Sequence, residues 1–128
     1  MKEAIQMAGI APSDIGYINA HGTSTVKGDI VETDAVKAVF ADSAYDVAIS
    51  SSKAATGHMM GAGGITEVIT CIKVIETGII PPTLNLENPD PKCDLNYIAE
   101  VTRKETKYAM SNAFGFGGQN SSIIVGKY

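Results

Sequence analysis

The stretch IGYINAHGTST, residues 15–25, decides the fold because it joins a short apolar run to a polar loop. Its first part, Ile15–Ala20, carries no charge and contains residues that favour strands, so it predicts a buried strand. Its second part, residues 21–25, combines a histidine, a glycine and three hydroxyl side chains, which is typical of a loop. Ligands usually bind at the carboxyl ends of strands in open α/β sheets. We therefore expect residues 21–25 to form part of a functional site.

Outward from this stretch, helical and strand patterns alternate along the chain. The spacing of apolar residues predicts helices at residues 1–9, 29–40 and 59–77, and strands at residues 45–50, 107–113 and 121–127. Residues 79–100 hold four prolines and predict a long connecting loop. The first helix has no N-cap, which indicates that the chain begins inside an element. The order favours an α/β fold with a mixed, mostly parallel sheet and a closing antiparallel hairpin.

Composition excludes several classes of protein. The 128 residues suit one domain, and 45% hydrophobic with 19% charged residues argues against disorder. A formal net charge of −4 argues against a nucleic-acid-binding surface as the main function. No apolar run approaches the roughly 20 residues of a membrane span, and the N-terminus does not resemble a secretory signal. Two cysteines without a CxxC motif support neither a disulfide framework nor a cysteine zinc site, and fit a cytoplasmic setting.

The only two histidines, His21 and His58, both lie in glycine-containing loops near the ends of predicted strands. Two unrelated loop histidines are the plain alternative, but the matching contexts AHGTST and TGHMMGAGG argue against it. His58 directly precedes the predicted helix 59–77, whose positive dipole end disfavours an imidazolium. A neutral imidazole can offer an N–H group to a developing oxyanion.

Lys53 and Glu67 are candidate partners. Lys53 lies in the same predicted loop as His58, where it is either a surface lysine or a fixed charge near a reaction centre. Glu67 stands inside the apolar helix 59–77, and a buried carboxylate normally needs a partner. Either Lys53 supplies that partner, or the helix is open to solvent at Glu67.

The sequence contains no clear nucleophile. Cys71 falls on an apolar helical stripe and reads as a structural thiol, while Cys93 lies in the proline-rich loop without an activating neighbour. The glycine cluster at residues 115–118 precedes a predicted strand, so it is not a dinucleotide-binding motif. Residues 50–53, SSSK, do not form a Walker motif.

Several motifs in register, covering nearly the whole chain, resemble the β-ketoacyl synthase family. The most similar members are synthases of the β-ketoacyl-acyl-carrier-protein synthase II type from fatty acid synthesis, and polyketide ketosynthases are close relatives. The motifs that carry the resemblance are NAHGTST (19–25), SSK (51–53), TGH (56–58), GAGG (61–64), PPTLNL (81–86), NPD (88–90) and SNAFGFGG (111–118).

The resemblance implies a thiolase-like fold built from two similar halves, of which this chain is the C-terminal half. Residues 1–128 would form one domain that is incomplete at its N-terminal edge, because the first strand of the half would be missing. We expect that strand to lie between the strands 15–20 and 107–113. Without it the chain would self-associate through strand edges, pair those two strands directly, or require its other half. The helix 59–77 would be buried between the two halves.

The resemblance also implies catalytic roles. His21 and His58 would hydrogen-bond the carbonyl oxygen of a malonyl thioester while carbon dioxide leaves, and the resulting enolate would attack an acyl-cysteine. Lys53 would be the active-site lysine and Glu67 its buried acidic support. The nucleophilic cysteine would come from the N-terminal half, so this chain alone would be inactive.

Further residues resemble binding positions of the family. Thr23 and Thr25 match threonines that hydrogen-bond a pantetheine arm, and Phe116 matches a gating residue beside the cysteine. A structural monovalent or divalent cation is implied at positions Asn19, Glu67, Ser111 and Asn112. No other cofactor is required, since phosphopantetheine arrives on the carrier protein.

The expected partners are an acyl carrier protein, the N-terminal half and a second copy in a homodimer, with no nucleic acid and no membrane. A basic cluster, Arg103, Lys104 and Lys107, could meet an acidic carrier protein, although a solvated charged turn explains it equally well. Two alternatives stay open: a polyketide ketosynthase portion, or a non-catalytic binding or assembly module of the same fold.

Overall fold

The structure, a computed structural model, describes residues 1–127. Its helices are α1 (Lys2–Ala8), η1 (Pro12–Asp14), α2 (Gly28–Phe40), η2 (Ala41–Tyr45), α3 (Lys53–Thr56), η3 (Met60–Ala62) and α4 (Gly63–Thr77). Its strands are β1 (Ile15–Asn19), β2 (Ala48–Ser50), β3 (Ile79–Ile80), β4 (Thr102–Arg103), β5 (Tyr108–Phe114) and β6 (Asn120–Gly126).

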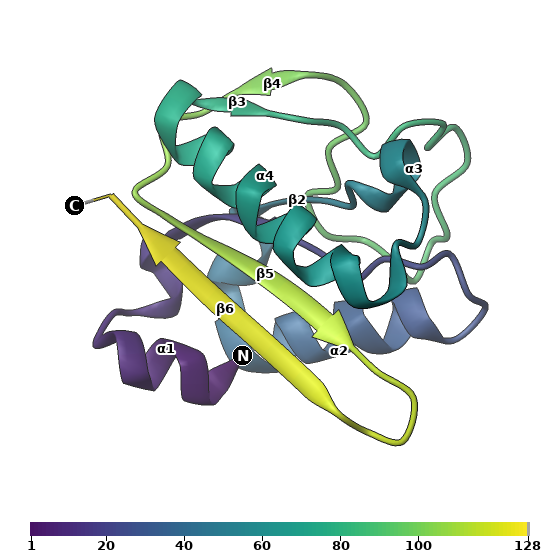
Figure 1. The fold of residues 1–128 in the computed structure, drawn as a ribbon, viewed down its shortest axis with the longest axis horizontal. Coiled ribbons are helices and arrows are strands. Elements are labelled where there is room, and N and C mark those ends of the chain that lie inside the picture. The colour runs from purple at the N-terminus through teal and green to yellow at the C-terminus, as the bar shows by residue number, and fades with distance from the viewer. Residues whose placement is uncertain (128) are drawn as a thin grey trace.

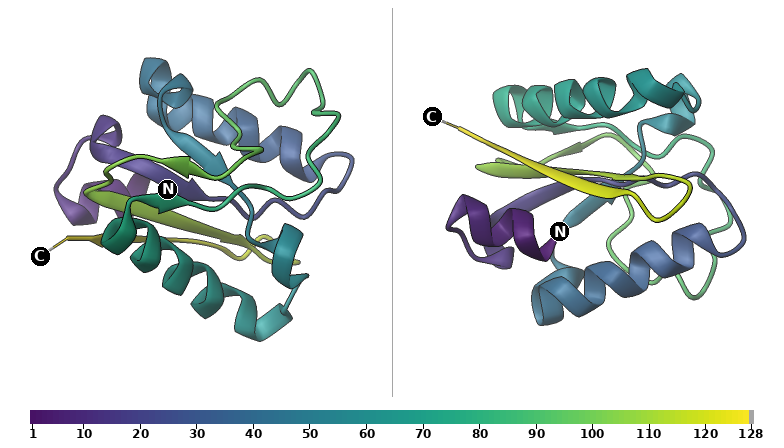
Figure 2. Two further views of the ribbon diagram at one scale, coloured as in Figure 1. Left: turned by 90° about the horizontal axis from the view of Figure 1, so that it is seen from above. Right: turned by 60° about the horizontal axis from the view of Figure 1, so that its bottom comes forward.

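A four-stranded sheet in the order β2-β1-β5-β6 forms the centre of the molecule. β1 pairs in parallel with β2 and with β5, and β5 pairs antiparallel with β6. The helices α1 and α2 cover one face of this sheet and α4 covers the other (Figures 1 and 2). The predicted α/β class, with a mostly parallel sheet and a closing hairpin, is confirmed.

The expected gap in the sheet does not exist. Ile18 pairs directly with Met110, and Asn19 with Ser111, so β1 and β5 are immediate neighbours. The prediction that a strand absent from this chain separates them is therefore wrong. Of the three outcomes expected for the gap, the structure corresponds to direct pairing of the two strands.

The outer edge of β2 is hydrogen-bonded to the segment around Tyr97. The N–H of Ile49 donates to the carbonyl of Asn96, and the N–H of Ile98 donates to the carbonyl of Ile49. Within residues 1–127, the edge of the main sheet that lacks a strand or bridge partner is the outer edge of β6.

Alternation along β1 divides the core into two layers. Ile18 packs with Val36 and Phe40 under α2, whereas Tyr17 packs with Cys71 and Val74 under α4. Burial of these side chains on both faces explains why β1 reads as an almost continuous apolar run.

The outer face of α4 is apolar but uncovered. Ile65, Ile69 and Ile72 follow one another at helical spacing and are 61%, 50% and 39% exposed. We call these three residues the α4 stripe. An exposed apolar row of this kind is a candidate contact surface.

Four local predictions need correction. The segment predicted as a polar loop contains the short helix α3, and the helix expected from residue 59 begins at Gly63 after the turn η3. The strand expected at residues 45–50 is shortened to Ala48–Ser50. The proline-rich segment is tied into the fold, since β3 pairs with β4 and Tyr97 bridges to Ile49.

In the described range 1–127, no helix has the length and apolar character to cross a membrane.

Candidate active site

The segments that follow β1 and β2 bring the two histidines together. The ring centroids of His21 and His58 lie 5.8 Å apart, with the rings nearly perpendicular at 86°. The ring of His21 also packs on Phe114 at the end of β5, at a centroid distance of 5.5 Å. The three segments thus meet at the carboxyl edge of the parallel strands, as the position of the loop 21–25 predicted.

The hydrogen bonding of His58 determines where a neutral ring carries its proton. Its Nδ1 accepts a hydrogen bond from the backbone N–H of Met60 at 3.1 Å. An accepting Nδ1 is unprotonated, so the proton of the neutral ring sits on Nε2. That Nε2–H can donate to an oxygen atom placed between the two histidines.

The environment of His21 favours its neutral form. Burial lowers the pKa of His21 below its ordinary value, and the charges of Lys53 and His58 lower it further. Its Nδ1 atom is buried and has no hydrogen-bond partner among residues 1–127. A neutral His21 can serve as a hydrogen-bond donor.

Glu32 holds the loop that carries His21, a role the sequence analysis did not identify. Its carboxylate accepts the backbone N–H of His21 and that of Gly22, both at 3.0 Å, and the side-chain N–H of Asn112 at 3.2 Å. Burial raises the pKa of Glu32, while these hydrogen bonds act in the opposite direction. A signal was present in the sequence, because Glu32 shares the buried face of α2 with Val36.

Lys53 on α3 and Glu67 on α4 form an ion pair, which is the first of the two alternatives that the sequence left open. Their side chains are only 8% and 3% exposed. A buried pair of this kind holds both groups in place, because removal of either partner leaves an uncompensated charge. The alternative that Glu67 faces solvent is therefore wrong.

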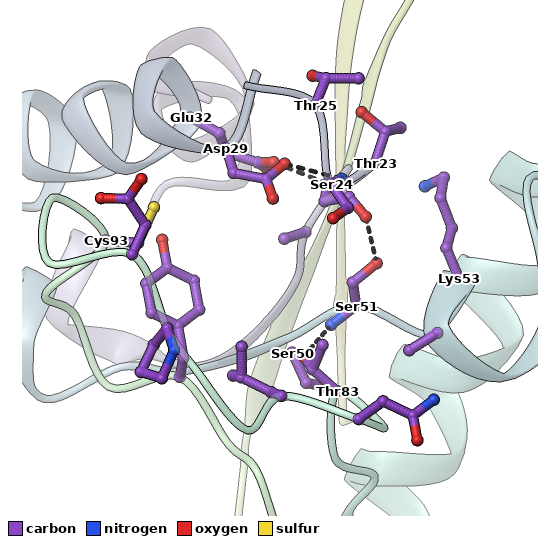
Figure 3. Close-up of a pocket in the computed structure, with 18 of the residues that line it drawn as sticks. Thr23, Ser24, Thr25, Asp29, Glu32, Ser50, Ser51, Lys53, Thr83 and Cys93 are labelled. Atoms are coloured by element: carbon purple, nitrogen blue, oxygen red, sulfur yellow. Dashed lines mark hydrogen bonds between the residues drawn. The ribbon is translucent and has the colours of Figure 1, made fainter. Parts of the chain in front are cut away.

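A pocket of about 630 Å³ opens beside these residues. Thr23, Thr25, Lys53 and His58 all contribute to its lining. Figure 3 shows the threonines above the pocket, Lys53 on one side, and Cys93 on the opposite side. The proline-rich segment supplies the wall opposite the threonines through residues 83–93.

Phe116 is not brought to this site by the described residues. It is 99% exposed in the turn between β5 and β6 and does not line the pocket. The aromatic residue that contacts His21 is Phe114, which the sequence analysis did not single out.

The four positions proposed for a cation do not converge. Asn19 and Ser111 are paired across β1 and β5, but Asn112 points to the opposite face, where it bonds Glu32. Glu67 is engaged by Lys53, and the side-chain oxygen of Asn112 accepts a hydrogen bond from Ser122. The side chains of Asn19, Glu67, Ser111 and Asn112 therefore do not fit one shared cation.

Cys71 is not activated by its surroundings. Burial raises the pKa of Cys71 to about 12, and its thiol contacts the carbonyl of Met110. Cys71 is thus the structural thiol that the sequence predicted, while Cys93 is a half-buried free thiol in the pocket wall.

Comparisons with known proteins show the family of the chain. Residues 1–87 match the family described as "Beta-ketoacyl synthase, C-terminal domain". The chain is 46% identical over 128 residues to 3-oxoacyl-[acyl-carrier-protein] synthase 2 of Coxiella burnetii, covering 99% of this chain and 31% of that protein. It is 44% identical over 123 residues to Nodulation protein E of Rhizobium leguminosarum bv. trifolii, covering 96% of this chain and 31% of that protein.

Solved structures show the same fold. A β-ketoacyl synthase from Burkholderia phymatum superimposes with a TM-score of 0.91 and 39% identity, covering 98% of this chain and 30% of that one. A type II PKS ketosynthase, in complex with its acyl-carrier protein, gives the same TM-score and identity over 95% of this chain and 30% of that one.

This chain spans about 31% of the length of the curated relative from Coxiella. The matched profile covers more than half of the chain, and the relatives from Coxiella and Burkholderia are both named as synthases. The predicted thiolase-like, C-terminal-half fold is confirmed, and the chain belongs to the β-ketoacyl synthase family as part of its C-terminal domain.

Proposed function

We propose that this chain supplies the histidine and lysine side of the active site of a β-ketoacyl-acyl-carrier-protein synthase in fatty acid biosynthesis. The reaction is a decarboxylative Claisen condensation of a malonyl-carrier thioester with an acyl-cysteine. The observation that carries the proposal is the pairing of His21 and His58 at 5.8 Å, with Nε2–H of a neutral His58 free to donate.

In the proposed reaction, the carbon–carbon bond to the malonyl carboxylate breaks and carbon dioxide leaves. The electron pair of that bond becomes an enolate, whose negative charge develops on the thioester oxygen. His21 and His58 donate hydrogen bonds to this oxygen, and removal of one such donor typically costs about 10²–10³ in rate. The enolate carbon then attacks the acyl thioester, and the cysteine leaves as a thiolate.

Neutral histidines suit this chemistry better than charged ones. An imidazolium would be an acid strong enough to protonate the enolate carbon before condensation. The lowered pKa of His21 and the Nδ1 hydrogen bond of His58 both support neutral donors. Lys53, fixed by Glu67, adds a positive charge at the edge of the site without needing to move.

The nucleophilic cysteine would come from an N-terminal half of the synthase. Cys71 is buried and Cys93 lies across the pocket from Lys53, so neither suits the role. The α4 stripe is the surface through which we propose that this chain meets that half. A homodimer of the complete enzyme and a cytoplasmic setting belong to the same proposal.

The pocket beside Thr23 and Thr25 would receive the phosphopantetheine arm of the acyl carrier protein. The relative solved with an acyl-carrier protein supports a carrier partner. The basic cluster is a weak docking surface, because Lys104 donates to the carbonyl of Asp46 and Lys107 lies over the ring of Tyr108.

The His58→Ala variant tests the function in a synthase completed with a cysteine-bearing N-terminal half. We expect loss of malonyl decarboxylation, with acylation of the cysteine partly intact, because His58 acts on the enolate oxygen. Carbon dioxide release and acyl-enzyme formation should be measured separately. Thr70→Ala, which removes a hydroxyl hydrogen bond to the carbonyl of Thr66 within α4, is the matched control. Surviving decarboxylation together with lost acylation would refute the assigned roles.

A polyketide ketosynthase portion is the second candidate. The type II PKS ketosynthase, at 39% identity and a TM-score of 0.91, supports it. Assay of the completed synthase with acetyl and with polyketide thioesters separates the two. Condensation with neither substrate would favour the non-catalytic module.

A further inference from the structure

Ser51 connects the loop that carries His21, the segment that follows β2, and the proline-rich wall of the pocket. It follows β2 directly, is buried, and stands two residues before Lys53. Its hydroxyl donates to the carbonyl of Gly22 at 3.0 Å, and its backbone N–H donates to the hydroxyl of Thr83 at 2.9 Å. Figure 3 shows the second of these bonds, between Ser51 and Thr83.

The contact between Ser51 and Gly22 is unusually close. A Cβ atom added at Gly22 would lie 2.7 Å from Cβ of Ser51, and Gly22 has a φ of +41°. Only glycine accepts this approach and this backbone conformation without strain. On its other side, the N–H of Gly22 donates to Glu32. The backbone next to His21 is therefore held between Ser51 and Glu32.

Thr83 extends the same connection to the pocket wall. Its backbone N–H donates to the carbonyl of Ile98, within the segment that bridges to β2. Tyr97 in that segment hydrogen-bonds Thr33 on α2. Because Thr33 donates its own hydroxyl proton to the carbonyl of Asp29, Tyr97 is the donor to Thr33. The proline-rich wall is thus anchored on both sides, and Ser51 is its anchor to the histidine loop.

We propose that Ser51 is a positioning residue that sets the separation of His21 from His58 and Lys53. It touches none of the reacting atoms; it acts through Gly22 on His21 and through Thr83 on the pocket wall. The proposal rests on the function proposed above, because it assigns a purpose to the distance between the two histidines.

The test measures the titration of His21 in this chain by NMR of the labelled imidazole rings. The ionisable groups around His21 are Lys53, His58 and Glu32, which makes its titration sensitive to the loop geometry. Ser51→Ala removes the hydroxyl but keeps Cβ. We expect its His21 midpoint to move upward toward the ordinary value near 6.5, because the ring becomes more exposed and moves away from Lys53.

Rescue and controls distinguish positioning from general destabilisation. Ser51→Thr, which keeps the hydroxyl, should restore the original midpoint. Ser43→Ala removes another partly buried hydrogen bond, from the Ser43 hydroxyl to the carbonyl of Phe40. It should leave the titration midpoint of His21 unchanged. A folded Ser51→Ala chain with an unchanged His21 midpoint would overturn the proposal.

If Ser51→Ala does not fold, Thr83→Val and Thr83→Ser take its place. Thr83→Val removes the acceptor for the Ser51 N–H and should shift His21 upward, while Thr83→Ser should not. Equal midpoints in these two variants would equally overturn the proposal. In an active synthase, Ser51→Ala should lower kcat for decarboxylation about 10- to 100-fold with little change in KM. The titration needs no catalysis, so its result is independent of whether the proposed function fails.

Discussion

The protonation of His21 links the chemistry of the site to the stability of the fold. His21 has a pKa held below its ordinary value by burial, by Lys53 and by His58. In the unfolded chain the ring would titrate near 6.5. Between these two pKa values the unfolded chain binds more protons than the folded chain, so folding is disfavoured as the pH falls through this window.

We therefore expect acidification from pH 7.5 to pH 5.5 to lower the free energy of unfolding. In the His21→Gln variant, the free energy of unfolding should decrease less over the same pH range. The difference between variant and wild type isolates His21 from Glu32, whose raised pKa acts in the opposite direction. Urea unfolding at several pH values measures both curves. Parallel curves for the two proteins would contradict the assignment.

Thiol reactivity is the second residue-scale prediction. The pKa of about 12 for Cys71 leaves almost no thiolate at neutral pH, and burial denies access to reagents. Iodoacetamide should therefore label Cys71 only after unfolding. Cys93 should react slowly in the folded chain, as an ordinary half-exposed thiol does. Rapid, stoichiometric labelling of Cys93 at pH 7 would show an activated nucleophile and would contradict the proposed dependence on another half.

The sequence alone singled out His21, His58, Lys53 and Glu67 as candidates. Their contexts drew attention to them, and the family resemblance implied their roles. The sequence did not identify Glu32, although the place of Glu32 on the same helical face as Val36 was a signal, and it did not identify Ser51, since a serine in a polar loop is ordinary. Their roles arise from hydrogen bonds to residues 10 and 29 positions away in the chain, which no local pattern reports.

At the scale of elements, α4 has two apolar faces with different roles. Val74 faces the sheet and is buried, whereas the α4 stripe faces outward. An apolar stripe on the outer side adds nothing to folding of this chain but can bury area against a partner.

Ile69→Lys should therefore leave the free energy of unfolding of the isolated chain nearly unchanged while abolishing association with an N-terminal half. Val74→Ala, the control from the other face, should lower that free energy by about 1–3 kcal/mol. Sedimentation and pull-down assays measure association, and urea unfolding measures stability. Unimpaired pairing of the Ile69→Lys chain would show that the contact surface lies elsewhere.

The sequence predicted the long elements well and the short ones poorly. Apolar periodicity revealed α2, α4, β1, β5 and β6, because each spans at least five residues and has apolar side chains in or against the two core clusters. The helix α3 and the strands β3 and β4 span two to four residues, too few for a period to appear. The proline-rich segment is held in place by hydrogen bonds that Thr83 and Tyr97 form with residues that are distant in the sequence. Because no local pattern shows such bonds, the sequence predicted only a connecting loop there.

At the scale of the whole molecule, strand order was the main error. The sequence correctly indicated a parallel sheet, but no pattern within a strand states which strand lies beside it. The uncharged run of β1 required burial on both faces and pairing on both edges, and β5 satisfies the second edge without an intervening strand. The superposition with a complete synthase at a TM-score of 0.91 shows that this order is also compatible with the larger enzyme.

The direct pairing of β1 with β5 determines when the sheet can form during synthesis of the chain. The pairing of Ile15 with Tyr108 joins residues about 90 positions apart, so the centre of the sheet closes only after β5 has been synthesised. Until the final hairpin emerges, both histidines and the apolar side chains of β1 are thus present in a nascent chain that cannot close its sheet, exposed to chaperones and proteases.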